Sequence, residues 1–280
     1  MKRISILILA AMIIILAYIS EEKNTTNRAP ICNKKAVIVD IDSLNIDQEL
    51  TYISLSKNDS SGYNRWLPFY FVVQGNENCT ERELEEELSQ RIKKINLLSE
   101  NNKIIFSTSE LIWSAYKLPG GVFNLSLVLI PKCGELGNIG LINVNSLELV
   151  INDNRTQLYS LEKYEIEERE TLYGDHAYIS VSTIDTSYTE NLTALVDYGI
   201  YVENGMKIES IEIDYPMNFS DIEKYEILEV KSAHEKEYIL TVSYHFSSLN
   251  PRTMFRPFLR VVYENGESGW LVPPLPVFIN

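Results

Sequence analysis

The chain has 280 residues, of which 45% are hydrophobic and 10% aromatic, and it carries a formal net charge of −14. This apolar content can fill one large core or two smaller ones, and we expect two domains. The negative charge argues against a nucleic-acid partner and against docking on an anionic lipid surface, because both would repel the protein.

The first twenty residues are an apolar segment behind a basic start. Lys2 and Arg3 precede an almost unbroken apolar run from Ile4 to Ile19, which is typical of an export signal or a membrane anchor. As a helix the run would span about 24 Å, slightly less than the bilayer hydrocarbon core of about 30 Å. Tyr18 stands where a signal peptidase needs a small residue. We therefore predict an uncleaved, single-pass signal anchor at residues 1–20, with the body outside the cytoplasm; the alternative is a cleaved signal and a secreted protein.

A polar stalk is expected at residues 21–34, followed by a mainly β domain at 35–136 that carries one helix. The helix is predicted from Glu81 to Leu98, because Thr80 and Glu83 form a capping box before it. Its apolar stripe consists of Leu84, Leu88, Ile92, Ile95 and Leu98. Strands rich in Val, Ile, Tyr and Phe are expected at Lys35–Ile41, Glu49–Leu55, Arg65–Val73, Lys103–Tyr116 with a break near Glu110, and Val122–Ile130.

A second domain is predicted at residues 141–280 as an antiparallel β-sandwich that is immunoglobulin-like in pattern. Its short strands recur at the spacing of such sandwiches, with Asn-Gly turns at Asn204 and Asn265. The clearest strand, Glu237–Phe246, alternates apolar and polar residues, which places His245 on its outward face. The predicted fold class is thus mainly β: an N-terminal anchor, an α+β domain with one helix, and a β-sandwich.

The extracytoplasmic location makes two modifications relevant. Glycosylation is predicted at six N-x-S/T sequons, which begin at Asn24, Asn58, Asn78, Asn154, Asn191 and Asn218, whereas a seventh at Asn124 lies within an apolar strand and is the weakest. The three cysteines, Cys32, Cys79 and Cys133, predict one disulfide and one remaining thiol, with the pairing left open.

Motifs for catalysis, nucleotides or metals are lacking in the sequence, and no cofactor is predicted. The acids of Asp40, Asp42 and Asp47 alternate with apolar residues, which favours a strand with solvated carboxylates over a calcium loop. The glutamate run from Glu162 to Glu170 is interpreted as an exposed, solubilising strand or connector.

One basic cluster stands out in the acidic chain. Arg252, Arg256 and Arg260 would share one face of an extended strand and could bind an anion or a partner, although pairing with neighbouring acids is the simpler interpretation. We expect a non-enzymatic module of the cell surface or envelope that binds a protein or a glycan. The alternative is an envelope hydrolase, similar in chemistry to a glycosidase, with a carboxylate pair that sequence does not locate.

Overall fold

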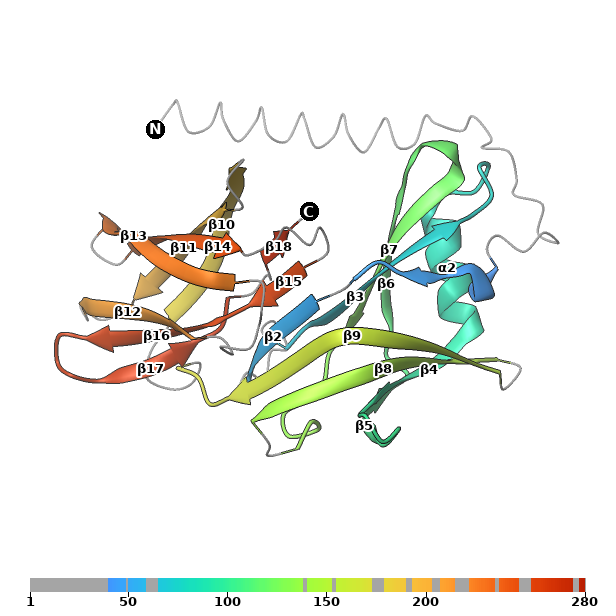
Figure 1. The fold of residues 1–280 in the computed structure, drawn as a ribbon, viewed down its shortest axis with the longest axis horizontal. Coiled ribbons are helices and arrows are strands. Elements are labelled where there is room, and N and C mark those ends of the chain that lie inside the picture. Colours follow the sequence, from blue (N-terminus) through green and yellow to red (C-terminus); the bar gives the residue numbers. More distant parts are fainter. Residues whose placement is uncertain are drawn as a thin grey trace, which may run out of the picture.

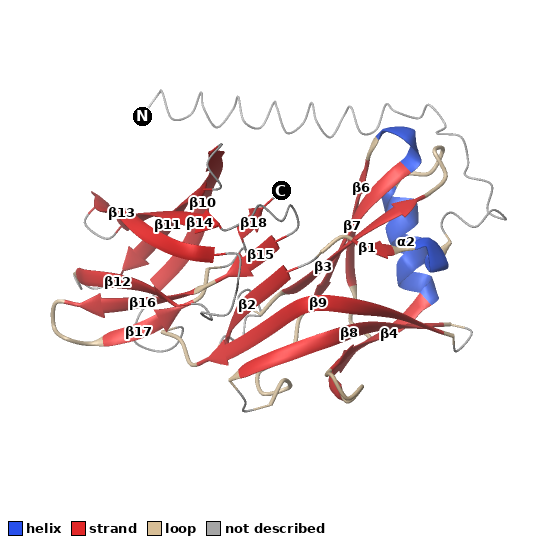
Figure 2. Ribbon diagram, in the orientation of Figure 1, coloured by secondary structure: helices blue, strands red, loops and turns tan. Residues whose placement is uncertain are grey.

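The computed structural model describes residues 40–48, 50–58, 65–137, 140–152, 155–172, 179–189, 193–202, 207–214, 222–234, 237–246, 253–273 and 277–279. Within these ranges the chain is mainly β, with several antiparallel sheets and a single α-helix (Figures 1 and 2). No helix in the described part has the length and hydropathy required to cross a bilayer. The predicted anchor and stalk lie outside the described residues.

The first lobe is built around a seven-stranded sheet with the order β18-β15-β2-β9-β8-β4-β5 and a four-stranded sheet with the order β1-β3-β7-β6. Between them lies the larger of two hydrophobic cores. The helix α2 (Glu81–Arg91) stands at one end of this lobe, beside β6 (Figure 1). The strands of this lobe are β1 (Asn45–Ile46), β2 (Leu50–Ser56), β3 (Leu67–Gln74), β4 (Ile92–Leu98), β5 (Ile104–Thr108), β6 (Ile112–Lys117), β7 (Val122–Leu129), β8 (Leu141–Ile151), β9 (Thr156–Arg169), β15 (Thr253–Arg256) and β18 (Val277–Ile279).

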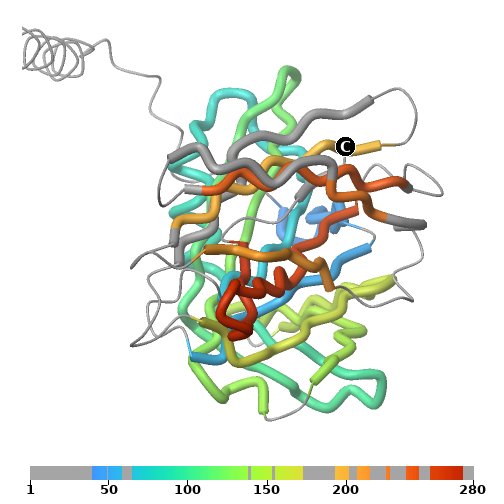
Figure 3. Tube along the Cα trace, turned by 90° about the vertical axis from the view of Figure 1, so that its left-hand side faces the viewer, coloured from blue at the N-terminus to red at the C-terminus, as the bar shows by residue number. Residues whose placement is uncertain are grey.

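The second lobe contains a four-stranded sheet, β10-β11-β14-β13, and a three-stranded sheet, β12-β16-β17. Figure 3 views the molecule from the side of this lobe. Its strands are β10 (Ile179–Thr189), β11 (Thr193–Val202), β12 (Ile208–Asp214), β13 (Ile222–His234), β14 (Glu237–Phe246), β16 (Phe258–Tyr263) and β17 (Ser268–Leu271). The predicted alternation of β14 is confirmed, because Leu240, Val242 and Tyr244 are fully buried in the second core.

Two strands connect the lobes by presenting a different face to each core. In β2, Ile53 belongs to the first core and Tyr52 to the second, and in β15 Met254 and Phe255 divide in the same way. The chain then changes sheet at Pro257, between β15 and β16. The two strands also pair with each other in parallel, although about 200 residues separate them in sequence.

The seven-stranded sheet takes strands from both sides of the predicted domain boundary at residues 137–140. Strands β8 and β9 follow this boundary, yet they pair with β4 and β2 of the first lobe. The segment 141–169 is thus part of the first lobe's sheet. Whether the two lobes are independent domains stays a prediction.

The predicted helix is correct at its start and wrong at its end. The capping box of Thr80 and Glu83 is present. The helix nevertheless stops at Arg91, and Ile92 to Leu98 form β4, whose backbone pairs with β5 and β8. The apolar residues of this segment fit both a helical and an extended pattern, and pairing on both sides decides in favour of the strand.

The predicted first strand also ends differently, since Asp40 caps the short 3-10 helix η1 (Ile41–Ser43) with its carboxylate. Residues 35–39 of that strand lie outside the described residues. A helical turn forms at this point because the Asp40 side chain accepts the backbone N–H of Asp42, a local bond that competes with strand pairing.

The prediction of an exposed glutamate run is confirmed at its two ends, where Glu162 and Glu170 are exposed, and is wrong between them. Strand β9 lies in the middle of the seven-stranded sheet, parallel to β2 and antiparallel to β8. Glu165 is only 3% exposed, and the Glu168 side chain is 2% exposed. Neighbouring strands on both sides bury the middle of this acidic segment, which no local pattern indicates.

Candidate functional site

The site begins with the way α2 covers the outer edge of β6, which is the last strand of its sheet. The Glu85 carboxylate accepts the backbone N–H of Ala115 at 2.7 Å, and Glu81 accepts that of Lys117 at 2.8 Å. Glu81 and Glu85 lie one helical turn apart, and Lys117 and Ala115 are two residues apart in the strand, so the two spacings match. The helix therefore supplies acceptors to an edge that would otherwise be open to pairing.

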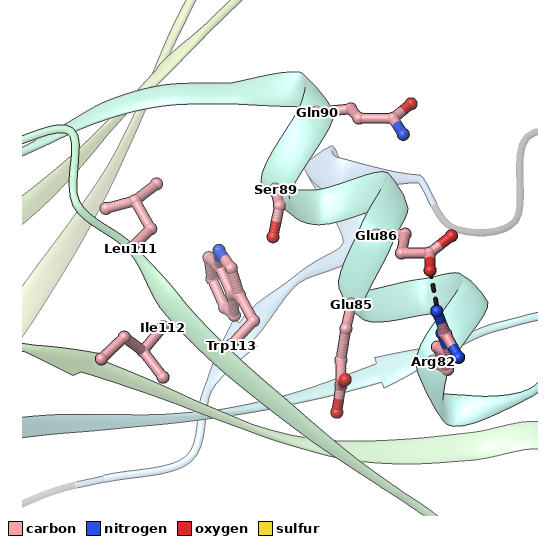
Figure 4. A pocket seen from close by; sticks show the side chains of 8 residues that line it. All are labelled: Arg82, Glu85, Glu86, Ser89, Gln90, Leu111, Ile112 and Trp113. Carbon is pink, nitrogen blue, oxygen red and sulfur yellow. Dashed lines mark hydrogen bonds and ion pairs between the residues drawn. The ribbon is translucent and has the colours of Figure 1, made fainter.

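The next position in this helical series is Ser89, whose side chain is much shorter than that of Glu. No hydrogen bond involving the Ser89 hydroxyl is seen within the described residues. A pocket of about 510 Å³ opens here between the helix and the strand (Figure 4). Its lining residues are Arg82, Glu85, Glu86, Ser89, Gln90, Leu111, Ile112 and Trp113.

Trp113 forms the floor of the pocket and is 7% exposed. Its ring packs against Phe71, with the ring centroids 5.9 Å apart. The indole Nε1 is buried and has no hydrogen-bond partner within the described residues. A buried donor without an acceptor costs about 1–3 kcal/mol, so a group that accepted this bond would recover free energy.

The remaining lining residues provide charge and apolar surface. Arg82 and Glu86 form an exposed ion pair at 3.0 Å, and Glu85 is engaged with Ala115. Ile112 is 52% exposed. The pocket thus combines one unused N–H donor, an apolar wall and an acidic rim, which suits binding of a ligand that carries an acceptor.

The arginine cluster predicted from sequence does not form a common face. Arg252 lies outside the described residues. Arg256 is completely buried and donates to the carbonyls of Ser54 at 2.9 Å and Trp66 at 3.0 Å. Arg260 is in another strand, part-exposed, and pairs with Glu212 at 3.0 Å. The even spacing does not place Arg256 and Arg260 on one face, because the chain turns from β15 into β16 at Pro257, between the two arginines.

A second buried cation, Arg65, lies just before β3. Arg65 is 1% exposed and pairs with Glu168 at 2.5 Å, while its other N–H groups donate to backbone carbonyls of Ser56, Pro131 and Lys132. The pair fixes the end of β9 to the loop after β7, which is a structural role.

A polar seam lies where the lobes meet. Arg169 pairs with Glu167 at 2.6 Å and Asp214 at 2.5 Å, and its guanidinium stacks within 4.6 Å of the rings of Phe258 and Trp270. The hydroxyl of Tyr52 donates to Glu167 at 2.9 Å. Burial, reinforced by Glu167, raises the pKa of Tyr52 far above its ordinary value.

The sequons differ in their surroundings. Asn78 is exposed, and the Thr80 of its sequon caps α2. Asn58 is exposed, and its side-chain amide bonds Thr171 through both Nδ2 and Oδ1. Asn124 lies on the exposed face of β7. The sequons at Asn24, Asn154, Asn191 and Asn218 lie outside the described residues, and glycosylation stays a prediction for all.

The cysteines occupy three environments. Cys79 is buried just before α2, Cys133 is exposed in the turn after β7, and Cys32 lies outside the described residues. The predicted disulfide stays a prediction.

His245 is half-buried, within 3.2 Å of the hydroxyls of Thr193 and Ser243. Its two ring nitrogens are therefore occupied by strand neighbours. Over the described ranges, no group of three or more His, Cys, Asp or Glu residues is placed to hold a metal ion.

Sequence reasoning missed the pocket because Trp113 looked like an ordinary strand residue. A signal was nevertheless present in the helix, where Glu81 and Glu85 are followed at the same spacing by Ser89. This spacing can be interpreted only when the helix is known to lie along a sheet edge. No known protein family matches this chain, and a comparison with curated proteins found no match.

Proposed function

We propose that this protein is a membrane-anchored, non-enzymatic module of the cell surface that binds a protein or glycan partner in the pocket beside Trp113. The observation that carries the proposal is the indole N–H, buried in the pocket wall with no acceptor among the described residues. A partner that supplies an acceptor would make this bond and gain its free energy.

Binding fits this pocket better than hydrolysis does. Its two carboxylates are already engaged, Glu85 with the Ala115 N–H and Glu86 with Arg82. They are also adjacent in the helix, so they point in different directions rather than across a substrate. A glycosidase needs two carboxylates that face each other from about 5 to 9.5 Å.

The finer features of the architecture belong to the same proposal. Residues 1–20 would anchor the protein, residues 21–34 would lift it off the membrane, and the second lobe would be an immunoglobulin-like sandwich. Protease added to intact cells should digest the body, and the protein should fractionate with membranes. A mature form that begins near Glu21 and is free in the medium would contradict the anchor.

The binding site can be tested through the three tryptophans. In the full chain, held in detergent micelles and labelled with ¹⁵N-tryptophan, the indole signal of Trp113 can be assigned with Trp113→Phe. We expect soluble oligosaccharides or short mixed-sequence peptides to shift this signal and to leave that of Trp270 unchanged. An unshifted Trp113 signal with both classes at millimolar concentration would contradict the site.

A further inference from the structure

We infer that the ligand of this pocket is an extended peptide segment that pairs with the open edge of β6 and carries a basic side chain. The inference rests on the proposed function and deepens it by naming the class of ligand. It depends on three features of the described residues: the direction of the β6 edge groups, the shape of the pocket and the charge of its rim.

The first feature is the direction of the backbone groups. Strand β6 pairs with β7 without a register shift over Ile112–Lys117. The N–H groups of Ala115 and Lys117 point away from β7, because they donate to the helix glutamates. Directions alternate along an antiparallel strand, so the N–H and C=O of Trp113 share this outward direction. One residue of an incoming strand could therefore exchange two backbone bonds with Trp113.

The second feature is the shape of the pocket, which is limited at one end by α2. Glu85 occupies the edge at Ala115, so an added strand has to stop before that residue. Beyond it, the pocket of about 510 Å³ has room for a short segment, with the exposed part of Ile112 as an apolar contact. Ser89 and Gln90 are exposed on the helix and can turn aside, which would let a peptide carbonyl reach the Trp113 indole N–H.

The third feature is charge, which favours a cationic segment over an acidic one. The lining includes Glu85 and Glu86 against a single arginine, Arg82, and α2 carries further glutamates at its surface. The Arg82–Glu86 pair has side chains that are 86% and 57% exposed, so it is held weakly and a ligand cation can compete for the carboxylate.

The test measures affinity of the full chain in detergent micelles for a capped peptide, Thr-Val-Lys-Val-Thr, by calorimetry. Two altered peptides accompany it: one with Glu in place of Lys, and one N-methylated on the backbone amides of the lysine and both valines, so that whichever of these three residues lies opposite Trp113 has lost its N–H donor. We expect each change to lower the affinity about tenfold, which is 1.4 kcal/mol. The effect of the lysine should also shrink with added salt.

A matched pair of protein variants places the binding at the edge. Ser89→Glu continues the series of Glu81 and Glu85 and supplies an acceptor to the Trp113 edge, so we expect it to abolish peptide binding while the protein stays folded. Gln90→Glu adds the same charge one residue further on, about 100° around the helix, and should keep or improve binding.

The outcomes separate the inference from the proposed function. Equal affinity for the N-methylated peptide, or full binding by Ser89→Glu, would overturn strand pairing. A Trp113 signal that shifts with oligosaccharides but not with peptides would overturn the peptide class and leave the binding pocket in place. If neither peptides nor oligosaccharides shift the Trp113 signal, the proposed function is contradicted as well.

Discussion

Two acidic segments of this protein, α2 and β9, have opposite places in the structure. The glutamates of α2 lie on a helix surface, where Glu81 and Glu85 accept the edge N–H groups of β6. Those of β9 lie in a central strand, where Glu168 pairs with a buried arginine and Glu165 is nearly inaccessible to water. Two segments that are both rich in glutamate thus differ in position: α2 covers the edge of β6 from outside, whereas the middle of β9 lies in the interior.

The difference teaches that strand neighbours, rather than the local density of acids, decide exposure. Helix α2 has a protein surface on one side only, and Glu86 on its other side is exposed to solvent. Strand β9 has a partner strand on each side, and its apolar residues belong to the first core, so the carboxylates buried beside them need internal partners. Arg65 and Arg169 supply these partners from distant or adjacent positions.

The largest expected effect comes from breaking the buried pair on β9. We predict that Arg65→Met lowers the free energy of unfolding by about 3–5 kcal/mol, because it leaves the Glu168 carboxylate buried without its cation. Urea denaturation followed by circular dichroism measures this change. The double variant Arg65→Met with Glu168→Leu should regain part of the loss. A single-variant loss below about 1 kcal/mol would show that the pair is solvated.

The fate of these two segments shows what the sequence can and cannot predict. The start of α2 was predicted correctly, because a capping box is a bond between residues three positions apart. The alternation of β14 was equally local and equally reliable. The burial of β9 depends on pairing with β2, whose residues lie more than a hundred positions earlier. No short-range pattern carries that information.

The same reason explains the errors at β4 and at the arginines. Ile92 and Ile95 satisfy a helical stripe, yet pairing with β8, more than fifty residues later, holds them in a strand. Arg256 was predicted to share one strand face with Arg252 and Arg260, but its strand β15 pairs with β2 and its side chain is buried. The pocket beside Trp113 escaped prediction because it arises where a helix and an edge strand meet.

A smaller effect is expected at the edge that α2 covers. Glu85→Ala removes the acceptor of the Ala115 N–H, and we predict a loss of about 0.5–1.5 kcal/mol in the free energy of unfolding. Glu85→Gln keeps an acceptor oxygen and should lose less. Glu86→Ala, which removes only an exposed ion pair, is the matched control and should stay within about 0.5 kcal/mol of the parent. Equal losses of unfolding free energy for Glu85→Ala and Glu86→Ala would contradict the role of Glu85 as an acceptor for the edge of β6.

The smallest expected effect is a change in pH dependence at Glu165. Burial raises the pKa of this carboxyl, although Lys163 acts in the opposite direction. Between the ordinary pKa of about 4.3 and the raised value, the folded protein keeps a proton that the unfolded chain has released. Stability therefore falls as pH rises through that window.

Glu165→Gln mimics the protonated carboxyl and should remove this fall. We expect the variant to match the parent below the window and to be more stable above it, in urea denaturation from pH 4 to 8. Glu170→Gln is the control, since the side chain of Glu170 is 81% exposed. Parallel stability curves for the parent and Glu165→Gln would show that Glu165 is hydrated in the folded protein.

The contrast between the two segments is tested most directly by carboxyl labelling of the folded full chain, read residue by residue by mass spectrometry. We predict that Glu86 of α2 reacts rapidly, whereas Glu165 and Glu168 of β9 stay unlabelled until the protein is unfolded. Labelling of Glu165 and Glu168 in the folded protein at the rate of Glu86 would contradict the interior position of β9 and the sheet arrangement that buries it.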